Sequence, residues 1–227
     1  MISFKGAHYP KDVILYAVYF YVRYGISYRD LEEILAERQV IVDHATLNRW
    51  VIKYSTSLAL TAKKSKRAVA TSWKMDETYI KVKGQWVYLY RAIDKFGDTV
   101  DFMLSEKRDE AAATAFFKQA IDANGFPHKV VMDKSGANYV GLENINLLLL
   151  LAGLISFVEI VQIKFLNNQI EQDHRFIKKI TKPMMGFNAF HSAKATLDGI
   201  ETAHMIRKGQ LTDENIPAYK QFMALAG

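Results

Sequence analysis

Apolar residues recur at helical spacing through the first quarter of the chain. Within residues 11–54 they return every three or four positions in three runs, each bounded by a turn or a capping signal. The first run ends at Gly25. The second begins after Ser27, with Asp30 in the register of a capping box, and the third begins after Asp43, a candidate N-cap. This pattern predicts three short helices joined by tight turns.

Three short helices with tight turns are typical of a helix-turn-helix unit. The third helix would then read DNA, and its early outward side chains would meet base edges or phosphates. These candidates are His44, Thr46, Asn48 and Arg49, with Lys53 suited to a phosphate. A small helical bundle used for packing or dimerisation gives the same spacing, so both interpretations stay open at this point.

The next segment is polar and basic. Residues 56–72 are rich in Ser, Thr, Ala and Lys, and the run KKSKR concentrates positive charge without an apolar face. We predict a basic linker here. The charge pattern fits a linker that touches phosphate and a solvated linker equally well.

From Trp73 onward the pattern becomes an alternation rich in Val, Ile, Tyr and Phe. Gly84 and Gly97 stand between three such stretches, which predicts an antiparallel meander of three strands. The later elements expected are a helix over 109–123, a strand over 129–133, a helix, a strand near 159–163 and a helix from about Asn168. Three strands followed by alternating helices and strands predict a mixed α/β layered domain.

One apolar stretch invites a membrane interpretation. Residues 144–158, NINLLLLLAGLISFV, carry no charge. Because about 20 apolar residues are needed to cross a bilayer, we predict instead a buried helix running into a buried strand. The N-terminus lacks the basic-then-apolar pattern of an export signal, so we expect a protein of the cytoplasm.

Composition narrows the classes of protein. With 227 residues, half of them hydrophobic, the chain can bury the core of one large domain or two small ones. It contains 30 Lys and Arg against 24 Asp and Glu, and the net charge of +6 makes an acidic polymer a plausible partner. Cysteine is absent, which excludes disulfides, thiolate zinc sites and cysteine nucleophiles.

Two acids stand within or at the end of predicted strands, where acids are depleted. Asp76 interrupts the first strand, and Asp133 ends the apolar strand KVVMD just before a polar turn. If these strands are neighbours, the two carboxylates converge. Close carboxylates repel each other unless a hard cation lies between them, and Mg²⁺ prefers oxygen ligands. Glu77 is expected on the opposite face, because side chains alternate along a strand.

A third acid belongs to the helix that begins near Asn168. Glu171 shares one side of that helix with His174, Arg175 and Lys178, at spacings of three, four and seven residues. An acid among bases suggests a metal ligand beside a phosphate track. A solvated, salt-bridged helix surface gives the same pattern, and three further acids compete for the site: Asp94, Asp101 and Asp173.

The order of these motifs resembles that of the IS6 family (IS26-like) of bacterial insertion sequence transposases. The matching stretches include FKGAHYPKDVIL, YGISYRDLEEILAERQVIVDHATLNRWV, WKMDETYIKVKGQWVYLYRAIDKFGDTVDF, VVMDKSGAN and FLNNQIEQDHRFIKK. Together with IRKGQ they run in order from Phe4 to Gln210. The resemblance therefore covers nearly the whole chain.

The resemblance implies a helix-turn-helix region followed by an RNase H-like (retroviral integrase-like) domain, in which helices flank a mixed sheet. It implies an Asp-Asp-Glu triad that holds metal and performs catalysis at Asp76, Asp133 and Glu171, and Lys178 matches the basic residue that follows the family glutamate. The limits expected are 1–55 for the DNA-binding region, 56–72 for the linker, 73–210 for the catalytic domain and 211–227 for a C-terminal tail.

The same resemblance implies Mg²⁺-dependent cleavage and strand transfer, with Mn²⁺ as a substitute metal. The expected partners are double-stranded DNA, as terminal inverted repeats and target, and further copies of the chain in a homodimer or higher homo-oligomer. The apolar run, or the helices after Phe187, would supply the interface, and the protein would work at the nucleoid.

Two alternatives remain for the function. One is a catalytically inactive DNA-binding protein or regulator derived from a transposase, and the other is an RNase H-like nuclease without strand transfer. Residues 134–170, between the second Asp and the Glu of the triad, form a longer spacer than family members usually show. The element boundaries in that spacer, and the activity of this copy, are therefore left open by the sequence.

Overall fold

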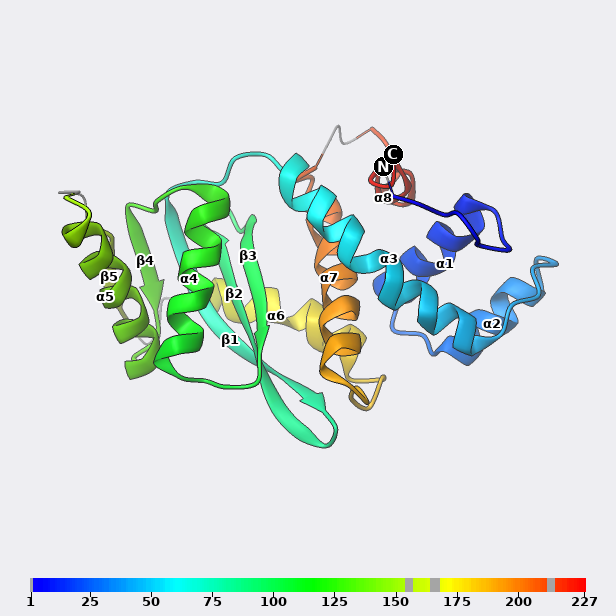
Figure 1. Ribbon diagram of the computed structural model, residues 1–227, viewed down its shortest axis with the longest axis horizontal. Coiled ribbons are helices and arrows are strands. Elements are labelled where there is room, and N and C mark those ends of the chain that lie inside the picture. Colours follow the sequence, from blue (N-terminus) through cyan, green and yellow to red (C-terminus); the bar gives the residue numbers. More distant parts are fainter. Residues whose placement is uncertain (1, 154–156, 164–167, 212–214) are drawn as a thin grey trace. The chain divides into compact units, whose positions relative to one another are not determined.

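The computed structural model describes residues 2–153, 157–163, 168–211 and 215–227. The chain folds as two compact units. One unit joins Met1–Arg67 to Phe176–Gly227 and is helical, whereas the other, Ala68–Arg175, holds the sheet (Figure 1). These units follow packing, and the functional limits expected from the sequence stay predictions.

The helical unit begins with the three helices that the sequence predicts. They are α1 (Lys11–Arg23), α2 (Tyr28–Ala36) and α3 (His44–Ser65). The capping box of α2 is formed, because Asp30 N donates to Ser27 Oγ at 3.0 Å and Ser27 N donates to Asp30 Oδ2 at 2.8 Å. Asp43 caps α3 by accepting from Thr46 N at 2.9 Å. The predicted helix starts are therefore confirmed.

The predicted linker over 56–72 is wrong in its first part, because α3 continues through Ser65. This part of α3 buries Leu58, Ala59 and Ala62. α3 packs against α7 (Phe190–Arg207), so closely that a Cβ on Gly199 would lie 2.8 Å from Ser55 Oγ. The charged run at 63–67 made this helical apolar pattern hard to recognise in the sequence. Its first two lysines lie in the last turn of α3, where positive charge is favourable at the negative end of the helix dipole.

The C-terminal part of the chain adds α7 and α8 (Ala218–Ala224) to the helical unit. α7 packs against α1, α3 and α8 and is buried over most of its length. Ile2 N donates to Ala226 O at 3.0 Å, so the two ends of the chain lie side by side (Figure 1). The sequence analysis expected an oligomer interface on the helices after Phe187. Because α7 is buried against other helices of the same chain, it does not suit that role.

The second unit is built on a five-stranded sheet in the order β3-β2-β1-β4-β5. The strands are β1 (Ser72–Val82), β2 (Gln85–Asp94), β3 (Thr99–Ser105), β4 (Lys129–Met132) and β5 (Glu159–Gln162). β1 to β3 pair antiparallel, whereas β4 runs parallel to β1 and β5 runs parallel to β4. The predicted meander and the mixed α/β class are confirmed, and the arrangement is RNase H-like.

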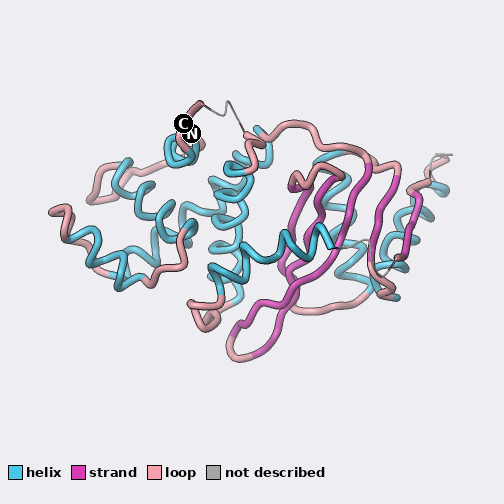
Figure 2. The backbone as a smooth tube through the Cα atoms, turned by 180° about the vertical axis from the view of Figure 1, so that it is seen from behind, coloured by secondary structure: helices cyan, strands magenta, loops and turns pink. Residues whose placement is uncertain are grey.

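Helices lie on both faces of this sheet. On one face α4 (Glu110–Asn124) and α5 (Gly136–Leu151) cover an apolar core (Figure 1). Its sheet residues include Trp73, Met75 and Tyr90. α4 and α5 approach so closely that a Cβ on Gly141 would lie 2.6 Å from Ala113 Cβ. The start of α6 (Asn168–Thr181) lies on the opposite face (Figure 2).

The prediction of a buried helix running into a buried strand over 144–158 is only partly right, because the end of α5 within this run is half buried, and β5 begins after the run, at Glu159, with no buried residue. Asn146 joins the two parts, since its Nδ2 donates to Val158 O at 3.1 Å and its Oδ1 accepts from Val158 N at 2.9 Å. The exposed side chains are Leu147, Leu148, Leu150 and Leu151, and residues 154–156 lie outside the described residues. No helix in the part of the chain that the structure describes is long and apolar enough to cross a membrane.

Candidate active site

Asp76 lies on the face of β1 that carries α6. Only 18% of its side chain is exposed, and its Oδ2 is 3.6 Å from His174 Nδ1. Burial, together with the negative charges of Glu77, Asp133 and Glu171, raises the pKa of Asp76 to about 7. The other two carboxylates that the sequence singles out therefore both lie within electrostatic reach of Asp76.

Asp133 follows β4 directly. Because β4 is the parallel neighbour of β1 and pairs Val131 with Lys74, continuing this register sets Asp133 beside Asp76. Its Oδ1 accepts a hydrogen bond from Ser135 N at 3.1 Å, which begins the turn into α5. The Asp133 side chain is 41% exposed, so it meets solvent at the carboxyl end of the strand, where α/β sheets commonly bind ligands.

Glu171 lies in the first turn of α6 and is exposed. The next turn of this helix is attached to the sheet. Arg91 Nη2 donates to Asp173 Oδ2 at 2.7 Å, and His174 approaches Asp76. α6 therefore brings Glu171 to the face of the sheet that holds Asp76 (Figure 2).

The three competing acids have other partners. Asp94 accepts hydrogen bonds from two backbone amides of its own turn and from Ala70 N. Asp101 accepts from Gln119 Nε2 at 2.8 Å, and Asp173 is paired with Arg91. Each of these carboxylates therefore has a partner within the fold, although the pair of Asp173 with Arg91 lies next to Asp76.

The charged residues of α6 do not all share one exposed side. Glu171, Arg175 and Lys178 are exposed, but His174 is only 3% exposed and lies against Asp76. The predicted DNA contact of His174 therefore does not fit its position. Helical spacing predicts that these residues share one side of the helix. It does not predict which of them the sheet covers.

Sequence reasoning missed a basic residue at this site, Arg108, in the loop between β3 and α4. Its Nε donates to Glu77 Oε1 at 3.0 Å, and its Nη2 lies 3.8 Å from Asp133 Oδ2. Glu77 lies across β1 from the His174 side, as strand alternation predicts, but Arg108 links it to the site. No periodic pattern could single out Arg108, because a loop residue has no helical or strand register.

The DNA-contact candidates of α3 lie in its first three turns. His44, Asn48, Arg49 and Lys53 are exposed, and Thr46 is partly buried. His44 Nδ1 lies 3.1 Å from Glu32 Oε2. Thr46 Oγ1 donates to Asp43 Oδ2 at 2.7 Å and accepts from Arg49 Nη2 at 2.6 Å. Thr46 thus orients the Arg49 guanidinium.

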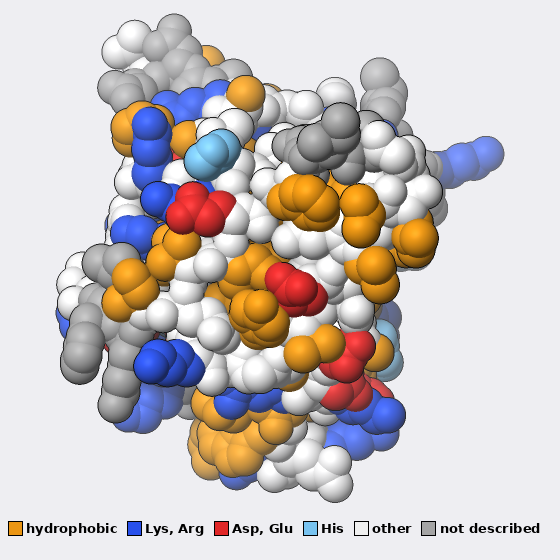
Figure 3. All heavy atoms as spheres, turned by 90° about the vertical axis from the view of Figure 1, so that its left-hand side faces the viewer, with side chains coloured by type: hydrophobic (Ala, Val, Ile, Leu, Met, Phe, Trp, Pro, Cys, Tyr) orange, Lys and Arg blue, Asp and Glu red, His pale blue; other side chains and the backbone are white. Residues whose placement is uncertain are grey.

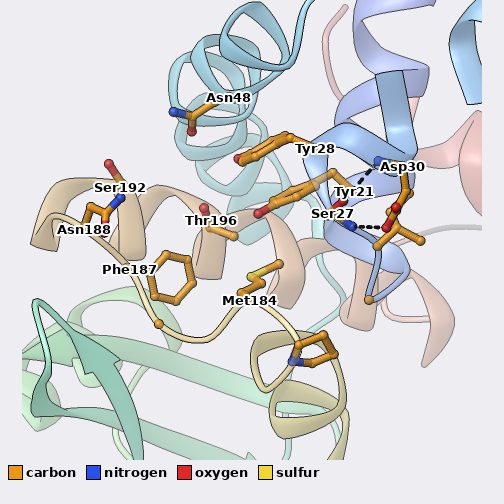
Figure 4. A pocket seen from close by; sticks show the side chains of 14 residues that line it. Tyr21, Ser27, Tyr28, Asp30, Asn48, Met184, Phe187, Asn188, Ser192 and Thr196 are labelled. Atoms are coloured by element: carbon orange, nitrogen blue, oxygen red, sulfur yellow. Dashed lines mark hydrogen bonds between the residues drawn. The ribbon is translucent and has the colours of Figure 1, made fainter. Parts of the chain in front are cut away.

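Asn48 also lines a cavity of about 450 Å³ in the helical unit (Figure 4). The cavity is bordered by Phe187, Asn188 and Tyr28, and the Tyr28 ring stacks on Tyr21 with centroids 3.9 Å apart. Its walls are mostly aromatic rings, amides and hydroxyls. This lining does not suit a phosphate, so any phosphate contacts of α3 belong to its exposed cations.

The chemistry of the carboxylates fits a hard divalent cation. Carboxylate oxygens are the ligands that Mg²⁺ prefers, and a cation would stabilise the ionised Asp76 carboxylate, whose pKa is raised by burial and by the neighbouring negative charges. Among the residues that the structure describes, no three His, Asp or Glu side chains are already arranged to hold a metal ion. Side-chain rotation at Asp133 or Glu171, which are both partly or wholly exposed, would have to complete such a site.

Comparison with known proteins gives a consistent result. A family model described as a DDE domain matches residues 70–210. The chain is 42% identical over 208 residues to the Staphylococcus aureus transposase for insertion sequence-like element IS431mec, covering 92% of this chain and 90% of that protein. It is equally similar, over the same shares, to the S. aureus transposase for insertion sequence element IS257 in transposon Tn4003.

Two solved structures are also similar to this chain. The HTLV-2 integrase catalytic core domain in complex with magnesium, in its trimeric form, aligns with a TM-score of 0.39 at 16% identity, over 70% of this chain and 86% of that one. Its dimeric form aligns with a TM-score of 0.44 at 17% identity, over 69% of this chain and 99% of that one.

Proposed function

Because the chain belongs to the IS6 family of DDE transposases, we propose that Asp76, Asp133 and Glu171 are its catalytic and metal-binding carboxylates. The observation that carries this proposal is the placement of Asp133 and Glu171 next to Asp76, because β4 pairs with β1 and α6 reaches Asp76 through His174. They come from β1, from the end of β4 and from α6, and the strands β1 and β4 are direct neighbours in the sheet. The enzyme is accordingly a transposase of an insertion sequence, acting on DNA.

The metal is proposed to be Mg²⁺, with Mn²⁺ as a substitute, held by these three residues. When bound, the metal supplies Lewis-acid stabilisation of the charge that develops on the phosphodiester. The protein keeps Asp76 largely out of water, which strengthens its attraction for a cation. His174 lies against the Asp76 carboxylate and limits its rotation.

The proposed reaction has two steps of one kind. Water attacks the phosphorus at the element end, a P–O bond forms, the bond to the 3′ oxygen breaks, and that oxygen leaves as a hydroxyl. The freed 3′-hydroxyl then attacks a target phosphodiester. The new P–O bond forms, the bond to the target's 3′ oxygen breaks, and that oxygen leaves as a hydroxyl after gaining a proton equivalent to the one that the attacking hydroxyl loses. No covalent bond to the enzyme is required, because the carboxylates act by positioning and electrostatics.

Terminal inverted repeats and target DNA are the proposed partners of the exposed basic residues. On α3 these are His44, Arg49 and Lys53, together with the exposed amide of Asn48, and Thr46 holds Arg49 in place. On α6 the exposed Arg175 and Lys178 follow Glu171 along the helix and suit the phosphate backbone. The DNA substrate places this work at the nucleoid in the cytoplasm.

A second copy of the chain is proposed to bind the exposed side of α5. Four leucines there are more than half exposed, and apolar side chains gather on this face (Figure 3). The four are Leu147, Leu148, Leu150 and Leu151. Contiguous apolar surface of this kind marks an interaction site, and the requirement to process two element ends together favours a homodimer or a higher homo-oligomer.

A cleavage assay tests the proposed function. Purified protein is incubated with a labelled duplex that carries an element end, with Mg²⁺, with Mn²⁺ or with EDTA. Metal-dependent release of a 3′-hydroxyl, followed by joining to target DNA, is expected. Binding without cleavage in every metal would favour a DNA-binding regulator, and cleavage without joining would favour a nuclease.

A further inference from the structure

Arg108 is held at both ends beside the catalytic carboxylates. Its main chain directly precedes Asp109, which caps α4 by accepting from Ala112 N at 2.9 Å. Its guanidinium is fixed by the hydrogen bond from Nε to Glu77 Oε1, at 3.0 Å. The guanidinium is therefore held on its Nε side.

The pair with Glu77 is not an ordinary surface ion pair. The Glu77 side chain is only 3% exposed, whereas the Arg108 side chain is 34% exposed. A buried carboxylate is costly unless a hydrogen-bonded cation accompanies it. Glu77 thus acts as a buried anchor, and Arg108 carries its positive charge outward from that anchor to the site.

The terminal nitrogen Nη2 of Arg108 lies near Asp133 but does not form a hydrogen bond with it. The distance of 3.8 Å from Nη2 to Asp133 Oδ2 exceeds the 2.7 to 2.9 Å or so that is typical of a charge-assisted hydrogen bond. Among the residues that the structure describes, Nε is the Arg108 donor with a hydrogen bond to another side chain. The terminal N–H groups are thus left for an acceptor that arrives next to Asp133.

A phosphodiester is the acceptor that this geometry suits. The guanidinium presents parallel N–H donors that match two oxygens of a phosphate, and its charge persists at any working pH. Asp76, Glu77, Asp133 and Glu171 concentrate negative charge here, which by itself repels DNA. A fixed cation next to Asp133 offsets that repulsion at the place where the reacting phosphate must lie.

We propose that Arg108, anchored by Glu77, donates a hydrogen bond to a non-bridging oxygen of the scissile phosphate. This inference rests on the proposed function, because it takes Asp133 as a ligand of the reacting site. The competing interpretation is that Arg108 serves the fold alone, through its pair with Glu77.

The test is a double-substitution cycle on DNA affinity. The full-length protein, with Ca²⁺ in place of Mg²⁺ to prevent cleavage, is titrated with an element-end duplex that has either a native phosphate or a methylphosphonate at the scissile position. The methylphosphonate lacks one charged oxygen. Wild-type protein is expected to bind the native duplex about tenfold more tightly than the best-bound methylphosphonate isomer, and Arg108→Ala to lose most of that preference.

Two further variants make the result specific. Arg108→Lys keeps the charge but not the paired donors, so it should retain only part of the preference, and it also serves if Arg108→Ala does not fold. Lys118→Ala removes one positive charge from an exposed pair on α4 and should behave as wild type. An unchanged preference in both Arg108 variants would overturn the proposal.

Failure of the proposed phosphate contact can be distinguished from failure of the proposed function. If wild-type protein cleaves native element ends in Mg²⁺ but the Arg108 variants keep the full preference for the native phosphate, only the phosphate contact fails. If wild-type protein cleaves in no metal, the proposed function fails first. Glu77→Gln should weaken the preference less than Arg108→Ala, because the amide oxygen can still accept from Nε.

Discussion

Arg91 and Asp173 form a buried ion pair, 2.7 Å from Nη2 to Oδ2, that ties α6 to β2. Arg91 is fully buried and is the cross-strand partner of Asp76 in the β1–β2 register, so the pair lies beside Asp76 on the sheet. The position of Glu171, two residues earlier on α6, depends on this attachment. The pair thus connects the stability of the sheet unit with the geometry of the site.

Removal of Asp173 is expected to cost both stability and activity. Asp173→Ala removes the carboxylate that pairs with the buried Arg91 charge, and breaking such a pair typically costs about 3 to 5 kcal/mol. We expect a comparable fall in the free energy of unfolding, measured by urea denaturation, and a large loss of element-end cleavage. Asp122→Ala, which removes an exposed acid from α4, is the matched control. Equal stability of the two variants would contradict a structural role for the ion pair.

The raised pKa of Asp76 predicts how stability depends on pH without metal. Since the pKa is about 7 in the folded protein and near 4 in an unfolded chain, the folded state binds the proton more tightly. Stability from this group is fully present below about pH 4 and is lost as pH rises through 7. In EDTA, the Tm difference between pH 5.5 and pH 8 should be smaller in Asp76→Asn than in wild type.

Binding of Mg²⁺ should favour the folded protein more at high pH than at low pH, opposite to the trend without metal. Mg²⁺ must displace the Asp76 proton, so its affinity is expected to rise between pH 6 and pH 8 and then level off. Titration of the wild-type Tm with Mg²⁺ at each pH measures this change. A metal affinity independent of pH over that window would separate Asp76 from the metal site.

DNA binding by α3 is expected to depend on Arg49 and Asn48. A base contact typically contributes about 1 to 3 kcal/mol, so Arg49→Ala and Asn48→Ala should each weaken element-end binding by up to a hundredfold or so. Thr46→Val should give a smaller loss, because it frees Arg49 without removing it. Gel-shift titration at fixed salt is the measurement, and unchanged binding in all three variants would favour a packing role for these helices.

Self-association is expected to depend on the exposed leucines of α5. The double change Leu148→Lys and Leu151→Lys places charges in the proposed interface and should shift the protein toward the monomer in sedimentation velocity runs. Leu60→Lys, on an exposed position of α3, is the matched control and should leave the distribution unchanged. A distribution that both sets of changes leave alone would place the interface elsewhere.

Much of this fold could be read from local sequence signals. The helix starts at Ser27 and Asp43 were predictable because a capping side chain bonds to the backbone three residues away. The acids at Asp76 and Asp133 were noticeable because a strand and its end disfavour an unpaired carboxylate. These inferences need only neighbours in sequence.

The remainder depended on tertiary packing. The continuation of α3 through Ser65 was hidden, because only α7 gives its small residues a surface to bury. His174 faces Asp76 because of the way α6 packs on the sheet, and helical spacing in the sequence does not predict that packing. Arg108 joins the site through Glu77, 31 residues away in sequence, and only the fold brings the two together.

Asp76, Asp133 and Glu171 are proposed to act as one catalytic group. The most direct measurement is strand transfer of a labelled element end by Asp76→Asn, Asp133→Asn and Glu171→Gln, with Asp122→Asn as control and end binding measured in parallel. Each triad variant is expected to bind the end nearly as wild type does and to give no detectable transfer, while the control stays active. Full strand transfer by any one of the three would remove that residue from the site and contradict the account.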